Sequence, residues 1–224
     1  MKKTILLFSA LLIFGNLSAQ DKAALVNPII GTNGMGHTFP GACVPFGLVQ
    51  LSPDTDTIPH NVDGKYQPRA YEYCAGYQHK DSSIVGFSHT HFSGTGHSDL
   101  GDILIMPATG ELKLNPGTAT DPDGGYRSRF SHDTEVSRPG YYEVMLADYG
   151  VKAQLTATKR VGVHKYTFPK EAKNQRIILD MIHGIYNYDG KVLWTNIRVE
   201  HDTLVTGYRI TNGWARTNYT YFSM

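Results

Sequence analysis

Residues 151–158 have the sequence Val-Lys-Ala-Gln-Leu-Thr-Ala-Thr, in which apolar and polar side chains alternate for much of the length. Successive side chains of a β-strand point to opposite faces, so this alternation predicts a strand with one buried face. Residues 161–168 alternate in the same way and end at Pro169, which has no N–H to continue a strand ladder. Both segments are therefore predicted strands.

Further β-rich segments lie on both sides of this pair, at roughly ten-residue spacing. They are residues 141–146, 176–181, 191–199, 203–210 and 219–224. Turn-forming sequences separate them, at residues 148–150, 189–190 and 212–213. No window shows a long helical period. The sequence predicts a mostly β fold, an antiparallel β-sandwich (a supersandwich) or a barrel. Residues 219–224 look like a strand in progress, so we expect a truncated product.

The first twenty residues have the three-part pattern of a secretory signal peptide. Lys2 and Lys3 are followed by a nearly unbroken apolar run over residues 5–14 and by small and polar residues before Gln20. The run is too short for a membrane-spanning helix, and the alternative is a short buried helix. We therefore expect a leader over residues 1–20 and one exported domain over residues 21–224, in the periplasm or outside the cell.

Charge argues against several classes of partner. The chain has 21 basic and 20 acidic side chains, and loss of Lys2 and Lys3 would bring the net charge to about −1. No basic face is implied, so nucleic acid and anionic membranes are poor partners, and no transmembrane segment is expected in the mature chain. Cys43 and Cys74 could form a disulfide after export or remain buried thiols, and the sequence leaves this open.

The first candidate functional loop covers residues 27–42 and is continued by Pro-Phe-Gly at 45–47. Its glycines permit positive φ angles and close approach of the backbone to a small polar ligand such as a sugar. A phosphate loop would need Gly-Lys-Ser/Thr and a following helix, which are missing. A plain irregular crossing between sheets remains an alternative. The candidate substrate-binding residues here are Gly34, Gly36, His37 and Thr38.

The second candidate loop, residues 86–102, carries three of the chain's ten histidines. His89 and His91 would share a face on an extended segment, and His97, Asp99 and Asp102 could return to it after a glycine turn. Three histidines could bind zinc, whereas calcium would prefer oxygen ligands and finds only two carboxylates here. Histidine also suits sugar hydroxyls, because it can donate and accept hydrogen bonds. The candidate substrate-binding residues are His89, His91, His97 and Asp99.

Tyrosines cluster between the two loops, at positions 66, 71, 73 and 77. Tyr71 and Tyr73 are candidate stacking partners for a sugar ring, and ordinary strand packing is the alternative. A glycosidase also needs two carboxyl groups, one acting as an acid and the other as a base or nucleophile. None of the carboxylates in this region stands out by its spacing, so no catalytic pair is predicted within this chain.

Several long motifs closely resemble the opening of glycoside hydrolase family 92. They are VNPIIGT (26–32), GHTFPGA (36–42), VPFGLVQLSPD (44–54), GFSHTHFSGTG (86–96), GDILIMP (101–107), PGYY (139–142) and LTATKRVGVHKYTFP (155–169). The resemblance covers essentially the whole chain after the leader.

The resemblance implies an exo-acting, inverting, calcium-dependent α-mannosidase that acts on terminal α-mannosides of glycans. It implies an N-terminal β-sandwich and a C-terminal (α/α)6 barrel, which is missing here and which would hold the acid, the base and most calcium ligands. The two loops would line the sugar pocket, and this chain alone would be inactive. Family members selective for α-1,2 linkages tend to have tryptophans where this chain has Tyr71-Glu72-Tyr73-Cys74, which argues against that selectivity. The alternatives are a stand-alone carbohydrate-binding module and a zinc site on His89, His91 and His97.

Overall fold

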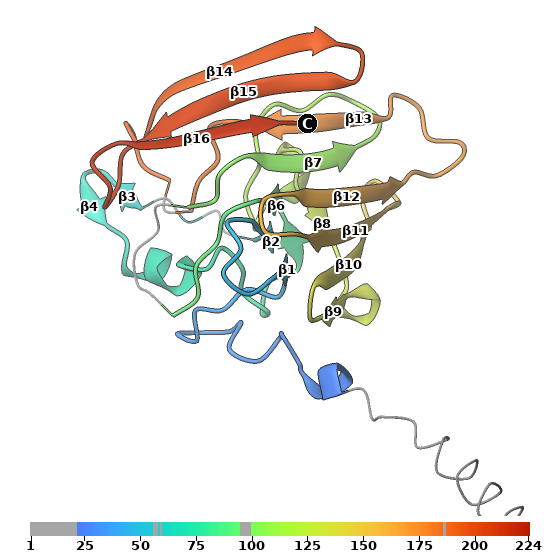
Figure 1. The fold of residues 1–224 in the computed structure, drawn as a ribbon, viewed down its shortest axis with the longest axis horizontal. Coiled ribbons are helices and arrows are strands. Elements are labelled where there is room, and N and C mark those ends of the chain that lie inside the picture. The colour runs from blue at the N-terminus through green and yellow to red at the C-terminus, as the bar shows by residue number, and fades with distance from the viewer. Residues whose placement is uncertain (1–21, 56–57, 59, 95–99, 186) are drawn as a thin grey trace, which may run out of the picture.

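The computed structural model describes residues 22–55, 58, 60–94, 100–185 and 187–224. The predicted leader lies outside them. The fold is mostly β and antiparallel, as predicted, and its helices are short 3-10 turns (Figure 1). These turns are η1 (Lys22–Leu25), η2 (Pro68–Tyr73), η3 (Pro122–Gly124) and η4 (His132–Thr134). In the described part of the chain, none has the length and apolar character needed to cross a membrane.

Two sheets form the body of the domain. The five-stranded sheet has the order β1 (Ala42–Cys43), β2 (Gln50–Asp54), β6 (Gly86–Ser88), β7 (Leu104–Ala108) and β13 (Arg176–Asp180). The four-stranded sheet has the order β12 (Gly162–Thr167), β11 (Val151–Ala157), β10 (Tyr141–Leu146) and β9 (Val136–Arg138). Their facing side chains form one core, in which Leu51, Phe87 and Leu104 meet Tyr142 and Leu155.

A three-stranded sheet lies along the upper side of the molecule in Figure 1. It consists of β14 (Val192–His201), β15 (Leu204–Thr211) and β16 (Asn218–Ser223). A buried ion pair ties it to the body, because Arg209 Nε on β15 lies 3.0 Å from Asp102 Oδ1. Two small hairpins complete the fold: β3 (Asn61–Val62) with β4 (Lys65–Tyr66), and β5 (Ser83–Ile84) with β8 (Ser128–Arg129).

The seven strands predicted from residue 141 onward are confirmed, with ends within two residues of those expected. β10 and β11 alternate buried and less buried residues because one face packs on the core. The part of the chain that contains the two candidate loops was given no strands from sequence, yet residues 42–108 supply β1, β2, β6 and β7 of the central sheet. β7 is buried at every position, so its sequence does not alternate between apolar and polar residues.

Cys43 and Cys74 are free thiols, which resolves the open question of a disulfide. Cys43 is exposed, whereas Cys74 is buried and its Sγ lies 2.7 Å from the carbonyl oxygen of Tyr71. The buried thiol therefore donates to the end of η2 and does not cross-link the chain.

Candidate functional site

The first loop is held in shape by a buried glutamine. Gly34 N donates to Gln78 Oε1 at 2.7 Å, and Gln78 Nε2 donates to Gly34 O at 2.9 Å. Gly36 approaches Gly31 so closely that a Cβ atom at residue 36 would lie 2.2 Å from the Gly31 carbonyl oxygen. Thr38 Oγ1 donates to Ile30 O at 3.0 Å. Glycine at position 36 is therefore required by the close approach of two backbone segments.

The two predicted loops meet. Gly94 N of the second loop donates to His37 O of the first at 2.8 Å. The rings of Phe39 and His91 lie 5.3 Å apart, again one from each loop. His37 has a positive φ of 51° and packs edge-on against Tyr71 with ring centroids 4.9 Å apart. Its Nε2 is buried without a hydrogen-bond partner among the described residues.

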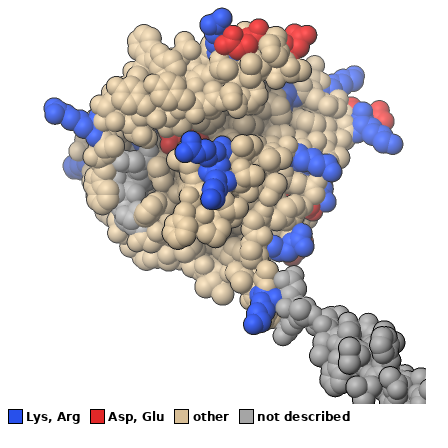
Figure 2. All heavy atoms as spheres, viewed as in Figure 1, with Lys and Arg blue, Asp and Glu red and all other residues tan. Residues whose placement is uncertain are grey.

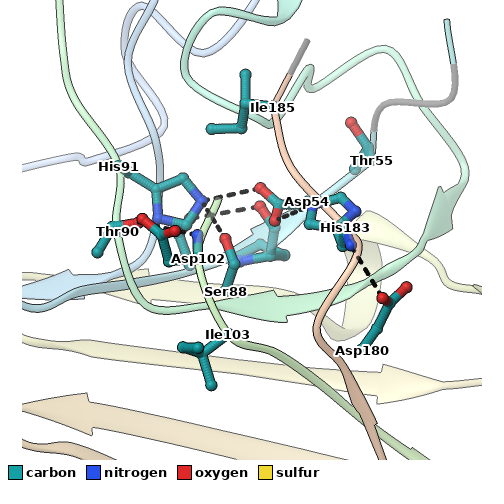
Figure 3. A network of polar contacts seen from close by, with 12 residues as sticks. Asp54, Thr55, Ser88, Thr90, His91, Asp102, Ile103, Asp180, His183 and Ile185 are labelled. Carbon is teal, nitrogen blue, oxygen red and sulfur yellow. Dashed lines mark hydrogen bonds and ion pairs between the residues drawn. The ribbon is translucent and has the colours of Figure 1, made fainter. Parts of the chain in front are cut away.

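Figure 3 shows that the carboxylate of Asp54 lies between the rings of His91 and His183. Asp54, at the end of β2, is fully buried and accepts from His91 Nε2 at 2.8 Å and from His183 Nε2 at 2.9 Å. His91 Nδ1 also lies 2.7 Å from the Gln50 carbonyl oxygen, which can only accept. Both ring nitrogens of His91 therefore face oxygen atoms, and the Ser88 hydroxyl lies 3.2 Å from Nε2 as a further partner.

The pKa of Asp54 follows from the same contacts. Burial alone would raise the pKa, since it penalises the charged carboxylate. The charge of His91 and the hydrogen bonds from His183 and His91 outweigh burial and hold the pKa of Asp54 well below its ordinary value. The arrangement is a buried salt bridge that is stable only while every partner is in place.

Two more carboxylates, the buried Asp102 and the half-buried Asp180, fix the surrounding segments. Asp102 accepts from Thr90 Oγ1 at 2.7 Å and forms the ion pair with Arg209. Asp180 Oδ1 accepts from the backbone N–H of Ile182 at 2.7 Å and of His183 at 2.9 Å. The bonds to Asp180 position His183 so that its ring reaches Asp54. Both carboxylates are already bound by donors of the protein.

His89 belongs to a second, separate histidine contact. His89 Nδ1 must donate to the Ile103 carbonyl oxygen at 2.7 Å, so its Nε2 is the acceptor in the neutral ring. His164 Nε2, 3.0 Å away, then donates to His89, and His164 Nδ1 accepts from the Tyr166 hydroxyl at 2.7 Å. Burial, with a smaller electrostatic contribution from the neighbouring His89, lowers the pKa of His164 to about 3. Burial likewise lowers the pKa of His89.

Two hollows flank the Asp54 network. One, of about 490 Å³, is lined on both loops by residues that include Phe39, Phe46, His91 and Phe92. The other, of about 400 Å³, is lined by residues that include His183. Asp54 therefore connects one histidine from each hollow. Figure 2 shows that Lys and Arg side chains on the visible face are scattered and do not form one extended patch.

The predicted substrate-binding residues fall into three sets. Gly34, Gly36, His37, Thr38 and Tyr71 lie in the first loop and its packing partner η2, and none of them lines either hollow. His97 and Asp99 lie outside the described residues.

The remaining three have protein partners. His91 lines the larger hollow and lies over Asp54, His89 bonds to Ile103 and His164, and the buried Tyr73 donates to Asp81 Oδ1 at 3.1 Å. In the described part of the chain, His89 and His91 are not in any group of ligand atoms close enough to hold a metal.

Sequence reasoning missed His183, Gln78 and Arg209, the buried residues that hold the site together. His183 lies 129 residues from its partner Asp54 in sequence, so no local spacing could have joined them. Asp54 was visible as one of several carboxylates, but nothing in the sequence marked it as the buried one.

Comparison with known proteins gives a consistent family assignment. The sequence model of the glycosyl hydrolase family 92 N-terminal domain matches residues 25–224. A family GH92 α-mannosidase from Bacteroides thetaiotaomicron, solved in complex with mannoimidazole, is 44% identical over 90% of this chain, with a TM-score of 0.79. A GH92 inverting mannosidase from the same organism is 26% identical over 90% of the chain, with a TM-score of 0.62.

An uncharacterized secreted glycosidase of Arthroderma benhamiae is 30% identical over 158 residues, 66% of this chain. The chain spans 24% of each of these two solved relatives and 18% of the Arthroderma protein. The match over residues 25–224, together with the shared fold, establishes that this chain belongs to glycosyl hydrolase family 92 and corresponds to its N-terminal domain.

Proposed function

We propose that this chain is the sugar-pocket domain of an exo-acting, inverting α-mannosidase that hydrolyses terminal α-mannosides of glycans. The observation that carries the proposal is the 44% identity, at a TM-score of 0.79, to an α-mannosidase solved with mannoimidazole. The relative described as an inverting mannosidase supports inversion. The contact between the two loops and the aromatic hollow beside them supports a role in holding the sugar.

The proposal divides the chemistry between this domain and another part of the enzyme. Inversion needs an acid and a base whose carboxyl groups are roughly 6.5–9.5 Å apart, with water between base and sugar. The carboxylates of Asp54, Asp102 and Asp180 are each held by histidine, arginine, hydroxyl or backbone donors. We therefore assign the acid and the base to a C-terminal (α/α)6 barrel of the same polypeptide, and binding and orientation of the sugar to this domain.

Calcium, like the acid and the base, is assigned to the other part of the enzyme. Calcium takes six to eight oxygen ligands, several of them carboxylates. The described residues do not fit such a site, because the carboxylates around the loops are already bound by cationic or N–H donors. We therefore propose that any calcium in the enzyme is bound by the barrel.

Export is part of the proposal. The leader pattern over residues 1–20 and the description of the Arthroderma relative as secreted both support a periplasmic or extracellular protein. An α-mannoside of a glycan would meet the enzyme there. N-terminal sequencing of the exported protein tests this, and a retained Met1 would contradict it.

The activity is tested with the complete gene product and an aryl α-mannoside. We expect hydrolysis that requires calcium, with β-mannose as the first product by NMR; release of α-mannose or absence of hydrolysis would refute the proposal. Phe92→Ala, in the larger hollow, should raise KM, whereas Leu112→Ala, at the same 56% exposure outside both hollows, should not.

The isolated 224-residue chain provides the second test. We expect no turnover of the aryl mannoside with or without calcium, because the acid and the base are assigned elsewhere. Calcium-dependent turnover by this chain would contradict that assignment. Calorimetry with manno-oligosaccharides separates the alternative of a stand-alone binding module, which would bind tightly without any other domain.

A further inference from the structure

Three side chains from two distant segments meet at the surface, away from both hollows. His79 lies in the segment between η2 and β5, while His132 and Glu135 lie at and just after η4. The ligand atoms of the three residues all lie within 4.8 Å of one another. In the part of the chain that the structure describes, no other set of histidine, cysteine and acidic side chains reaches this spacing.

The local sequence explains why His132 and Glu135 share one face. Ser131 caps η4, since its Oγ accepts from Asp133 N at 3.2 Å, and Glu135 N donates to His132 O at 3.1 Å. One 3-10 turn places residues i and i+3 above each other, so the two side chains project together. The ring of His79 then lies over that of His132, with centroids 4.0 Å apart.

Two tyrosine hydroxyls hold the Glu135 carboxylate. Tyr77 donates to it, 2.8 Å from Oε1 and 3.0 Å from Oε2, and Tyr142 donates to Oε1 at 2.6 Å. Oε2 also faces the histidines, 2.7 Å from His132 Nδ1 and 4.0 Å from His79 Nδ1, and the Tyr77 hydroxyl lies 3.4 Å from the latter. Only 3% of the Glu135 side chain is exposed, and the two tyrosines are buried. Such hydrogen bonds from behind fix the orientation of a metal-binding carboxylate.

The donor set selects the class of metal. Two imidazole nitrogens and one carboxylate oxygen suit zinc, which binds such sets tetrahedrally and often keeps its fourth position for water. The side chains of His79 and His132 are 40% and 37% exposed, so the fourth position would open to solvent. A single carboxylate is too few for calcium.

From this geometry we propose that His79, His132 and Glu135 bind one zinc ion, with water in the fourth position. On binding, the metal replaces the hydrogen bond between His132 Nδ1 and Glu135 Oε2, and the neutral ring carries its one proton on Nε2. The ion links the segment before β5 to the turn before β9. This proposal does not depend on the α-mannosidase assignment, and the site is separate from the sugar hollows.

The test uses untagged protein that has been stripped with a chelator, dialysed and titrated with zinc chloride by calorimetry. The wild type should bind one zinc per chain and should show a higher melting temperature with zinc than with chelator. His79→Ala and His132→Ala should abolish this binding, and Tyr142→Phe should weaken it by about tenfold or more, because it loosens the carboxylate. His201→Ala, on the exposed β14, should bind like the wild type.

Either of two results with zinc would overturn the proposal. One is a wild type that binds no zinc, in which case the cluster is a hydrogen-bonded pair only. The other is stoichiometric binding that persists in both histidine variants, which would place the metal elsewhere in the chain. Cobalt substitution needs no variant: tetrahedral cobalt in the wild type gives strong visible absorption, and weak absorption typical of octahedral cobalt would contradict the site.

Discussion

Replacing Asp54 by Asn tests whether the buried carboxylate holds the domain together. The side chain keeps its size but loses its charge and one of its two acceptors. Asp54 accepts from His91 and His183 through different oxygens, so an amide, with one oxygen, can keep only one of these bonds. Its NH2 group would face the other histidine as a second donor, and both His91 and His183 would lose the charge of their shared partner.

The size of the effect follows from burial. Asp54 and His91 are both about as buried as side chains can be, at 0% and 1% exposure. Removing one partner of a buried ion pair costs about 3–5 kcal/mol, since the other charge stays behind unpaired. For a domain of this size each kcal/mol lowers the melting temperature by about 2–4 °C, so we expect a fall of about 6–20 °C.

The assay is thermal and denaturant unfolding at pH 7, followed by circular dichroism. Asp202→Asn is the matched control, because it makes the same chemical change at an exposed position in the β14–β15 turn. We expect the control to lie within about 0.5 kcal/mol of the wild type. If Asp54→Asn were as stable as Asp202→Asn, the argument that the buried Asp54 carboxylate holds His91 and His183 in place would be refuted.

Three further results are expected from the same measurements. The pKa of His164 falls from 6.5 to about 3 on folding, so the unfolded chain binds more protons between these values and the wild type loses stability as pH drops through them. His164→Leu should flatten this loss, and an unchanged slope would contradict the burial of a neutral ring. Leu155→Ala should cost about 2–5 kcal/mol because it opens a cavity between the sheets, whereas Val163→Ala, 45% exposed on β12, should cost under about 1 kcal/mol; equal losses would contradict the core assignment. Gly36→Ala should cost about 1–3 kcal/mol because its Cβ would overlap the Gly31 carbonyl, and a neutral result would show that the loop can shift.

The sequence was informative wherever one face of a strand is buried and the other is not. Residues 141–146 and 151–157 alternate in burial as they alternate in polarity, so their period was readable. β2 and β7 gave no such signal, because nearly all of their residues are buried. Each also contains a proline, Pro53 or Pro107, although both strands lie inside the sheet order. Proline normally argues against an inner strand, which is why the central sheet was hidden.

The candidate site shows a similar limit. Glycine and histidine content singled out the two loops, and the Gly94–His37 hydrogen bond confirms that they meet. The individual roles of their histidines depended on partners that no local pattern could supply. His91 bonds Asp54 and Gln50 at the base of the loops, and His89 pairs with His164, 75 residues away in sequence. The role of these residues in contacting a sugar therefore stays a prediction.

The position of the Asp54 network bears on the proposal that this domain orients the sugar while the acid and the base lie elsewhere. A pocket wall that orients a sugar must hold its geometry within a fraction of an ångström, and loops rich in glycine are poor at this on their own. Here the second loop is anchored through His91 to a carboxylate on β2, and His183, beside the other hollow, is anchored to the same carboxylate. Arg209 extends the network to the three-stranded sheet through Asp102 and through the backbone oxygen of His183. His91 and His183 share one buried charge, that of Asp54. If either histidine moved away, the carboxylate would be left incompletely paired in a buried site, which is costly. We therefore expect the second loop and the segment that carries His183 to keep a single geometry.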